Sequence, residues 1–270
     1  MINLSLLNAT STNNLNFMQR VWSIVVQHYP IILGGVGKTL LVAVIGTVVG
    51  LIIGVLVGVL RTYPLSKNRI VRFFQKMFNT VMVGYIEIFR GTPMMVQAMV
   101  LFYGYSELTQ IRPDVEIASI IIVSINTGAY MAEIVRGGII SIDKGQVEGA
   151  YAVGMTHTQT MFYVVIPQMF KNILPAISNE FVINVKDTSV LNVIGLWELY
   201  RIGDKIIKYS FSTFEVYLII CVIYFILTFT ITRILRLIEK KLEGNSNYTI
   251  CGSQSDPKAQ IRIIKESNNG

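Results

Sequence analysis

Apolar residues gather in long runs along this chain, instead of recurring on one face at amphipathic spacing. A helix needs about 20 mostly apolar residues to cross the hydrocarbon core of a membrane. The pattern therefore predicts an all-α membrane protein with about five transmembrane helices, over residues 31–60, 77–105, 115–135, 173–195 and 214–235. The second is interrupted by Arg90-Gly91-Thr92-Pro93, and the fourth is rich in polar residues.

Polar segments flank the predicted spans and divide the chain. We expect residues 1–30 to form a poorly ordered external polar arm, because residues 8–16 are mostly Asn, Ser and Thr and the basic segment of a signal peptide is missing. Residues 31–242 form the predicted transmembrane domain, which includes a long loop over 137–172. Residues 243–270 are polar and predict a flexible tail, in which residues 261–264 could add a short helix or strand.

The composition excludes soluble and disordered classes. Hydrophobic residues make up 52% of the chain and charged residues only 14%, and the mean hydropathy is +0.55. The chain has a net charge of +7. In a membrane protein such an excess of basic residues usually lies in cytoplasmic loops that face anionic lipid, and it does not by itself indicate nucleic-acid binding. Cys221 and Cys251 lie in an apolar run and in the polar tail, so the sequence predicts no disulfide framework.

The distribution of basic residues predicts the direction of the spans. Cytoplasmic loops carry an excess of Lys and Arg. Such an excess follows the first and the fifth span, at Arg61, Lys67, Arg69, Arg72 and Lys76, and at Arg233, Arg236, Lys240 and Lys241. We therefore expect the N-terminus outside the cell membrane and the C-terminus in the cytoplasm.

Glycine recurs every fourth residue in the first predicted span, at Gly46, Gly50, Gly54 and Gly58. On a helix these positions form a smooth stripe, which permits another helix to approach closely. The partner helix could belong to this chain or to a second copy. Upstream, Gly37-Lys38-Thr39 resembles the end of a phosphate-binding loop, but Ile32 stands where that motif requires its first glycine, so nucleotide binding is not predicted.

The interruption in the second span predicts a special site. Pro93 lacks a backbone N–H, so a helix break there frees polar backbone groups that hydrocarbon cannot satisfy. We expect the break to face a cavity, with Met94, Met95 and Gln97 following it. The alternative is a simple kink with lipid-facing methionines.

The fourth span carries ionisable groups at membrane depth, where they are costly unless they face a cavity or each other. Glu180 could bind the ammonium group of a small zwitterion or cation, and Asn126 of the third span could face the same cavity. The alternative is a buried structural network, for example Asp187 with Arg90. Lys186 and Asp187 are adjacent and point apart, which favours a structural or gating role.

The loop over 137–172 predicts a helix, a glycine turn and a second helix. Asp143 suits a helix start, and Gly154 suits a left-handed helix stop. Thr156 and Gln159 have the spacing of a capping box that starts another helix, which Pro167 then limits. A rigid elbow of this kind suits docking of a soluble partner, with His157 as an exposed interface residue.

The sequence shows no catalytic constellation or metal cluster. At the end of the third span, Glu133 and Arg136 have the spacing of an ion pair.

The same loop carries a resemblance to a known family. Glu148-Gly149-Ala150, then Gly154, then Val164-Val165-Ile166-Pro167 resembles the E-A-A, G, I-x-L-P signature of the membrane subunits of binding-protein-dependent ABC importers. All spacings match, and Gly149 replaces the first Ala of the signature. The segments 89–97, 179–181 and 186–189 resemble the polar amino acid permeases, which import His, Arg, Gln, Glu and cystine. The resemblance covers about residues 35–242.

The resemblance implies a type I importer permease fold and roles for particular residues. Substrate would bind near mid-membrane at Thr92, Met94, Met95, Gln97, Glu180, Asp187, Thr188 and Ser189. The elbow would dock on cytoplasmic ATPase subunits through Glu148, Gly149, Ala150, Gly154, Met155, Thr156, His157, Gln159 and Pro167. ATP and Mg²⁺ would bind those ATPases, so this chain would be no enzyme and would hold no cofactor. A second permease subunit, identical or related, and an external solute-binding protein would complete a prokaryotic importer of polar amino acids.

Two other classes of function remain as alternatives. An ion-coupled amino acid transporter would be expected to show inverted repeats with paired broken helices, and only one clear break is visible. A membrane scaffold has little need for the charged groups of the fourth span.

Overall fold

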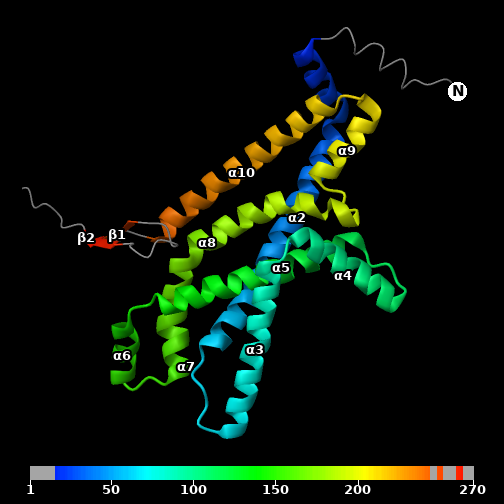
Figure 1. Ribbon diagram of the computed structural model, residues 1–270. Coiled ribbons are helices and arrows are strands. Elements are labelled where there is room, and N and C mark those ends of the chain that lie inside the picture. Colours follow the sequence, from blue (N-terminus) through cyan, green and yellow to red (C-terminus); the bar gives the residue numbers. More distant parts are fainter. Residues whose placement is uncertain (1–15, 244–247, 252–259, 264–270) are drawn as a thin grey trace, which may run out of the picture.

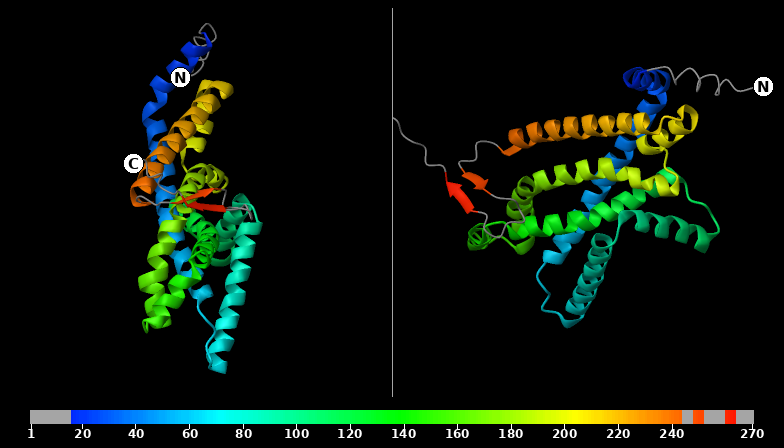
Figure 2. Two further views of the ribbon diagram at one scale, coloured as in Figure 1. Left: turned by 90° about the vertical axis from the view of Figure 1, so that its left-hand side faces the viewer. Right: turned by 45° about the horizontal axis from the view of Figure 1, so that its top comes forward.

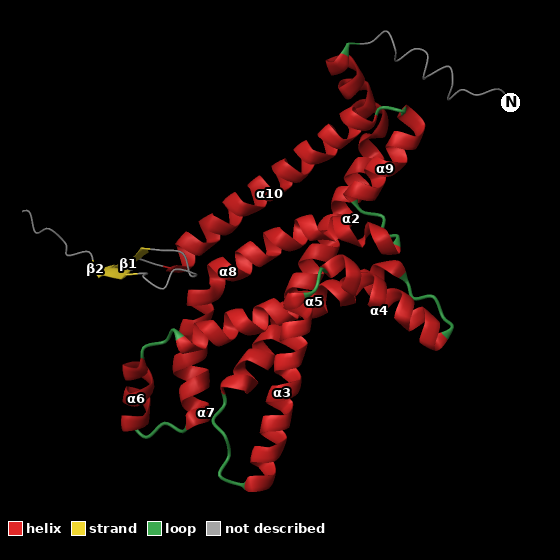
Figure 3. Ribbon diagram, in the orientation of Figure 1, coloured by secondary structure: helices red, strands yellow, loops and turns green. Residues whose placement is uncertain are grey.

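The computed structural model describes residues 16–243, 248–251 and 260–263, and nearly all of them are helical (Figures 1 and 3). The elements in chain order are α2 (Phe17–Thr62), α3 (Arg69–Gly91), α4 (Met94–Thr109), α5 (Val115–Ile140), α6 (Lys144–Ala152), α7 (His157–Thr160), the π-helix η1 (Met161–Val165), α8 (Ile166–Asp187), the 3₁₀-helix η2 (Thr188–Ile194), α9 (Leu199–Ser210), α10 (Thr213–Glu243), β1 (Tyr248–Cys251) and β2 (Gln260–Ile263).

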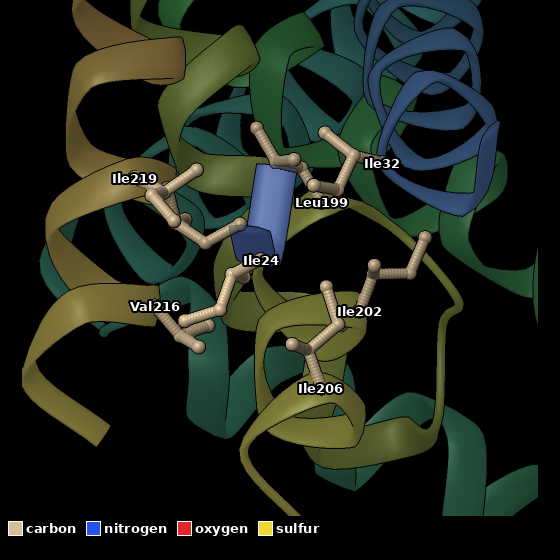
Figure 4. Close-up of a cluster of buried hydrophobic side chains, with 8 residues drawn as sticks. Ile24, Ile32, Leu199, Ile202, Ile206, Val216 and Ile219 are labelled. Carbon is tan, nitrogen blue, oxygen red and sulfur yellow. The ribbon is translucent and has the colours of Figure 1, made fainter. Parts of the chain in front are cut away.

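The first helix starts earlier than its hydropathy indicates. Helix α2 has 46 residues, so at about 1.5 Å per residue it is longer than a bilayer is thick. The predicted arm over residues 1–30 is therefore wrong for residues 17–30, which are helical, while residues 1–15 lie outside the described part. Ile24 of this extension packs, together with Ile32 of the predicted first span, in a buried cluster with residues of α9 and α10 (Figure 4). This packing outweighs the local polarity on which the prediction rested.

Three helices of the described chain, α2, α5 and α10, are long and apolar enough to cross a membrane. The second predicted span is divided at the expected place, since α3 ends at Gly91 and α4 begins at Met94. The fourth predicted span corresponds to α8 and η2. These two elements contain many polar residues, so they are less apolar than the three helices named above. Figure 2 shows α5, α8 and α10 lying side by side and crossing α2.

The glycine stripe of α2 packs against α5 of the same chain. A Cβ atom added at Gly50 would lie 2.7 Å from Cβ of Thr127, and one added at Gly58 would lie 2.7 Å from Cγ1 of Val135. At Gly54 the added atom would meet the α5 backbone, 2.8 Å from the carbonyl carbon of Met131. The predicted seam is thus internal to the chain, and its register shows that α2 and α5 run in the same direction.

The long loop forms α6, a turn, and then a continuous helical run from α7 to η2. Pro167 does not limit a helix, contrary to the prediction, because it occupies the first turn of α8 directly after the π-helix. There the amide of Ile166 bonds to the carbonyl of Met161, five residues earlier, so the widened turn accommodates a residue that has no N–H. In the tail, β1 pairs with β2 antiparallel, and this confirms a strand at residues 261–263.

Candidate functional site

One buried side chain, that of Gln97, bridges the helix break between α3 and α4 through hydrogen bonds. The Gln97 amide nitrogen donates hydrogen bonds to the backbone carbonyls of Phe89, at 2.9 Å, and Thr92, at 2.8 Å. It also lies 2.8 Å from the Thr92 hydroxyl oxygen. The Gln97 oxygen accepts a hydrogen bond of 2.8 Å from the Asn126 amide of α5. Two backbone carbonyls that the break frees, those of Phe89 and Thr92, are therefore bound by a side chain of the protein.

This arrangement brings together three of the predicted substrate-binding residues. Thr92, Gln97 and Asn126 are in contact, but the amide hydrogens of Gln97 already face backbone acceptors. The two methionines after the break are not alike. Met94 is half-buried against the cluster that contains Phe102, and Met95 is exposed.

Glu180 is a predicted binding residue that is buried in the helical packing without a polar partner among the described residues. Its residue is 7% exposed, and its carboxylate forms no hydrogen bond or ion pair with another described residue. Asp187 and Arg90 lie close enough to Glu180 to interact with its charge. The alternative ion pair of Asp187 with Arg90 is not formed within 4.0 Å in the described chain, and Arg90 instead lies over the Tyr130 ring, 5.6 Å from its centroid.

One turn after Glu180, α8 is fixed to α2 and α5 by a network that the sequence did not reveal. The Asn184 amide donates to the hydroxyls of Thr47, at 2.8 Å, and Thr127, at 2.9 Å. All three side chains are buried. Thr47 directly follows Gly46 of the glycine stripe of α2, and a polar residue beside that stripe was the available signal. The network holds the helix that carries Glu180.

The last predicted binding residues lie where α8 tightens into η2. The Thr188 hydroxyl donates to the carbonyl of Val185 at 2.9 Å, and the Ser189 hydroxyl donates to that of Lys186 at 2.7 Å. Thr188 is fully buried, so it faces packed protein in this conformation.

A second unpredicted network involves Glu198, which is fully buried. Its carboxylate accepts hydrogen bonds from the backbone amides of Tyr200 and Arg201, both at 2.8 Å, and so caps α9. It also accepts one from the Tyr224 hydroxyl of α10 at 2.7 Å. Glu198 therefore connects the segment between α8 and α10 to a membrane span.

The predicted elbow is confirmed in its local structure. The Asp143 side chain accepts from the Gly145 amide at 2.6 Å and starts α6. Gly154 has a φ of +85°, which a residue with a Cβ adopts only with strain. The Thr156 amide donates to the Gln159 side chain at 2.8 Å, as a capping box requires. Glu148 and Gly149 are exposed on α6, whereas Ala150 is buried.

His157 is not the exposed residue that we expected. Its Nδ1 lies 2.9 Å from the Tyr151 hydroxyl, and the Tyr63 ring packs edge-on against it with centroids 4.7 Å apart. Its Nε2 is buried without a hydrogen-bond partner among the described residues. Tyr63 follows α2 directly, and the sequence pattern does not bring it near the elbow. His157 therefore joins the elbow to the end of the first helix.

Ion pairs join the C-terminal ends of α2 and α5. Glu133 forms the predicted ion pair with Arg136, at 2.8 Å, and an unpredicted one with Arg61, at 2.6 Å. These side chains line a pocket of about 250 Å³ together with Glu87 and Arg90 of α3. No group of three or more His, Cys, Asp or Glu side chains in the described ranges is placed to hold a metal ion.

Comparison with known proteins assigns the chain to a family. Residues 50–244 match the family described as the binding-protein-dependent transport system inner membrane component. The chain belongs to this family. The glutamine transport system permease protein of Escherichia coli (strain K12) is 36% identical over 227 residues, which cover 84% of this chain and 99% of that protein. The L-cystine transport system permease protein of Bacillus subtilis (strain 168) is 33% identical over 224 residues, covering 82% and 91%.

Solved structures agree with this assignment. The crystal structure of an amino acid ABC transporter with histidines matches with a TM-score of 0.71 and 33% identity, over 84% of this chain and 99% of that one. The methionine ABC transporter MetNI in an inward-facing conformation matches with a TM-score of 0.62 at 20% identity, over 78% and 98%, which supports the fold alone. The chain thus has the type I importer permease fold, and it is a membrane component of a binding-protein-dependent transport system, not an ion-coupled transporter or a scaffold.

Proposed function

We propose that this chain is the permease subunit of an ATP-driven importer of polar amino acids. Relatives that transport glutamine and L-cystine support this class of substrate. The observation that carries the proposal is the carboxylate of Glu180, which is mostly buried in the helical packing and has no hydrogen-bond partner among the described residues.

An amino acid supplies the groups that this environment lacks. Its ammonium group would neutralise Glu180, and its carboxylate would be attracted by Arg90. The break residues Thr92, Met94, Met95, Gln97 and Asn126 and the α8–η2 residues Asp187, Thr188 and Ser189 would border the pathway. Because Gln97 and Thr188 are engaged in this conformation, their contribution to binding would require a rearrangement during transport.

The energy for transport would come from other chains. Two ATPase subunits, which bind ATP and Mg²⁺, would dock in the cytoplasm on the elbow formed by α6, Gly154 and α7. The exposed side chains of Glu148, Thr156 and Gln159 support this docking, as does Val153, which is 79% exposed. A second permease subunit would complete the pathway, and an external binding protein would deliver the substrate, with the N-terminus outside and the C-terminus in the cytoplasm.

The test is reconstitution of this chain with its ATPase in proteoliposomes that contain ATP. A binding protein loaded in turn with glutamine, arginine, histidine or cystine is added outside, and ATP hydrolysis and uptake are measured. We expect at least one loaded binding protein to stimulate both. Uptake driven by an ion gradient without the ATPase, or stimulation by none of the amino acids, would contradict the proposal.

A further inference from the structure

A basic pocket lies between α8 and α10, and none of the residues assigned to the substrate lines it. Its volume is about 290 Å³. The two helices run side by side (Figures 1 and 2). The pocket is lined by Val182, Lys186, Phe225, Thr228, Phe229, Thr232, Arg233 and Arg236. Three of these residues are cations and none is an acid.

None of the three cations forms an ion pair in the described ranges, although Asp187 lies close enough to Lys186 for their charges to interact. Neither Lys186 nor Arg233 nor Arg236 forms an ion pair within 4.0 Å there, although four such pairs occur elsewhere in the described chain. The Arg233 guanidinium lies over the Phe229 ring, 4.9 Å from its centroid, and this contact fixes the charge at the pocket wall. Like charges held close together repel each other, so an anion bound between them would stabilise the arrangement.

The surroundings of the pocket are apolar. Phe225 is 64% exposed and Phe229 is 49% exposed on the same helix. Only 11% of the most apolar stretch of α10 is buried inside the chain, so most of this helix faces the membrane or another subunit. A ligand that fits these conditions combines an anionic head with hydrocarbon chains.

The depth of the cations agrees with such a ligand. The predicted fifth span ends at residue 235, so Arg233 and Arg236 lie at the boundary between hydrocarbon and headgroups. The long side chain of Lys186 can extend toward the same boundary. Guanidinium groups bind phosphate through several parallel hydrogen bonds, and basic pockets between transmembrane helices are suited to anionic headgroups. We propose that this pocket binds the phosphate headgroup of an anionic phospholipid.

The test is native mass spectrometry of the purified full chain in detergent, titrated with phosphatidylglycerol, phosphatidylcholine or inorganic phosphate. The pocket variant is Lys186→Gln/Arg233→Gln/Arg236→Gln. The control is Lys67→Gln/Arg69→Gln/Lys76→Gln, which removes three exposed cations from the predicted cytoplasmic side without touching the pocket. We expect the pocket variant to bind phosphatidylglycerol at least about tenfold more weakly than the wild type, and the control to stay within about twofold.

The other ligands separate the possible sources of the anion. Phosphatidylcholine should bind the wild type more weakly than phosphatidylglycerol does, and millimolar phosphate should not displace phosphatidylglycerol. The single variant Arg236→Gln, at an exposed position, should weaken phosphatidylglycerol binding by a few fold. It keeps the test valid if the triple variant does not fold. Equal phosphatidylglycerol binding by the wild type and the pocket variant would overturn the proposal, and so would displacement by phosphate alone. Because the assay contains neither ATPase nor amino acid, its failure would leave the proposed transport function standing.

Discussion

The side-chain amide of Asn126 in α5 donates a hydrogen bond of 2.8 Å to the side-chain oxygen of Gln97, 29 residues earlier in the chain. Gln97 in turn donates to the carbonyls of Phe89 and Thr92, which the break between α3 and α4 leaves without helical partners. The break is therefore held in shape from α5.

We predict that Gln97→Met destabilises the protein by about 1–3 kcal/mol, because the methionine keeps the volume but leaves the carbonyls of Phe89 and Thr92 and the buried Asn126 amide without their hydrogen bonds. The apparent melting temperature of the purified chain in detergent measures this loss. Gln146→Met, at an exposed position of α6, is the matched control and should melt like the wild type. Equal melting of the Gln97 variant and the wild type would show that the hydrogen bonds across the break add no stability.

Local patterns in the sequence predicted much of the fold. The break at Pro93, the capping box of Thr156 and Gln159, and the left-handed Gly154 each follow from residues within one or two turns of a helix. Their geometry depends on backbone chemistry that the sequence displays directly. Residues 17–30 were mispredicted because their helix is stabilised by α9 and α10, which lie more than 150 residues away in the chain.

The candidate site was predictable only in part for the same reason. Glu180 could be selected as a candidate from the sequence, because an ionisable residue at membrane depth costs free energy whichever residue lies next to it. Which polar groups satisfy each other depends on long-range packing. The contact of Asn184 with Thr47 joins residues 137 positions apart, and Glu198 reaches Tyr224 of another helix. No local spacing indicates such pairs.

The seam between α2 and α5 yields a second prediction. A Cβ at Gly54 would lie 2.8 Å from the carbonyl carbon of Met131 and 2.9 Å from the amide nitrogen of Ala132, so the α5 backbone would have to move. We expect Gly54→Ala to destabilise the chain by about 1–3 kcal/mol through overpacking. Gly37→Ala on the same helix meets nothing within 4 Å and should be neutral or slightly stabilising in the same thermal assay. Identical melting of the two variants would contradict the close approach of the helices.

The elbow yields a third prediction, which rests on the proposed docking of the ATPase. Gly154→Ala places a Cβ at a φ of +85°, at a cost of about 1–2 kcal/mol, so the turn between α6 and α7 should change shape. We expect fewer amino acid molecules transported per ATP hydrolysed. Gly84→Ala in α3, where an added Cβ meets nothing within 4 Å, should couple normally. Normal coupling in the Gly154 variant would show that the shape of this turn does not affect how ATP hydrolysis drives transport.

The role of Glu180 yields the last prediction, because its two possible roles differ in what they require. If its charge neutralises the ammonium group of the substrate, Glu180→Gln should lower uptake by about tenfold or more, since a neutral amide cannot replace the charge at membrane depth. The purified complex should still assemble with the ATPase, because no described residue depends on this carboxylate for a hydrogen bond. Uptake and assembly are measured in parallel, with the exposed Glu107→Gln as the matched control. Loss of assembly in the Glu180 variant would indicate a structural role, and unchanged uptake would remove Glu180 from the pathway.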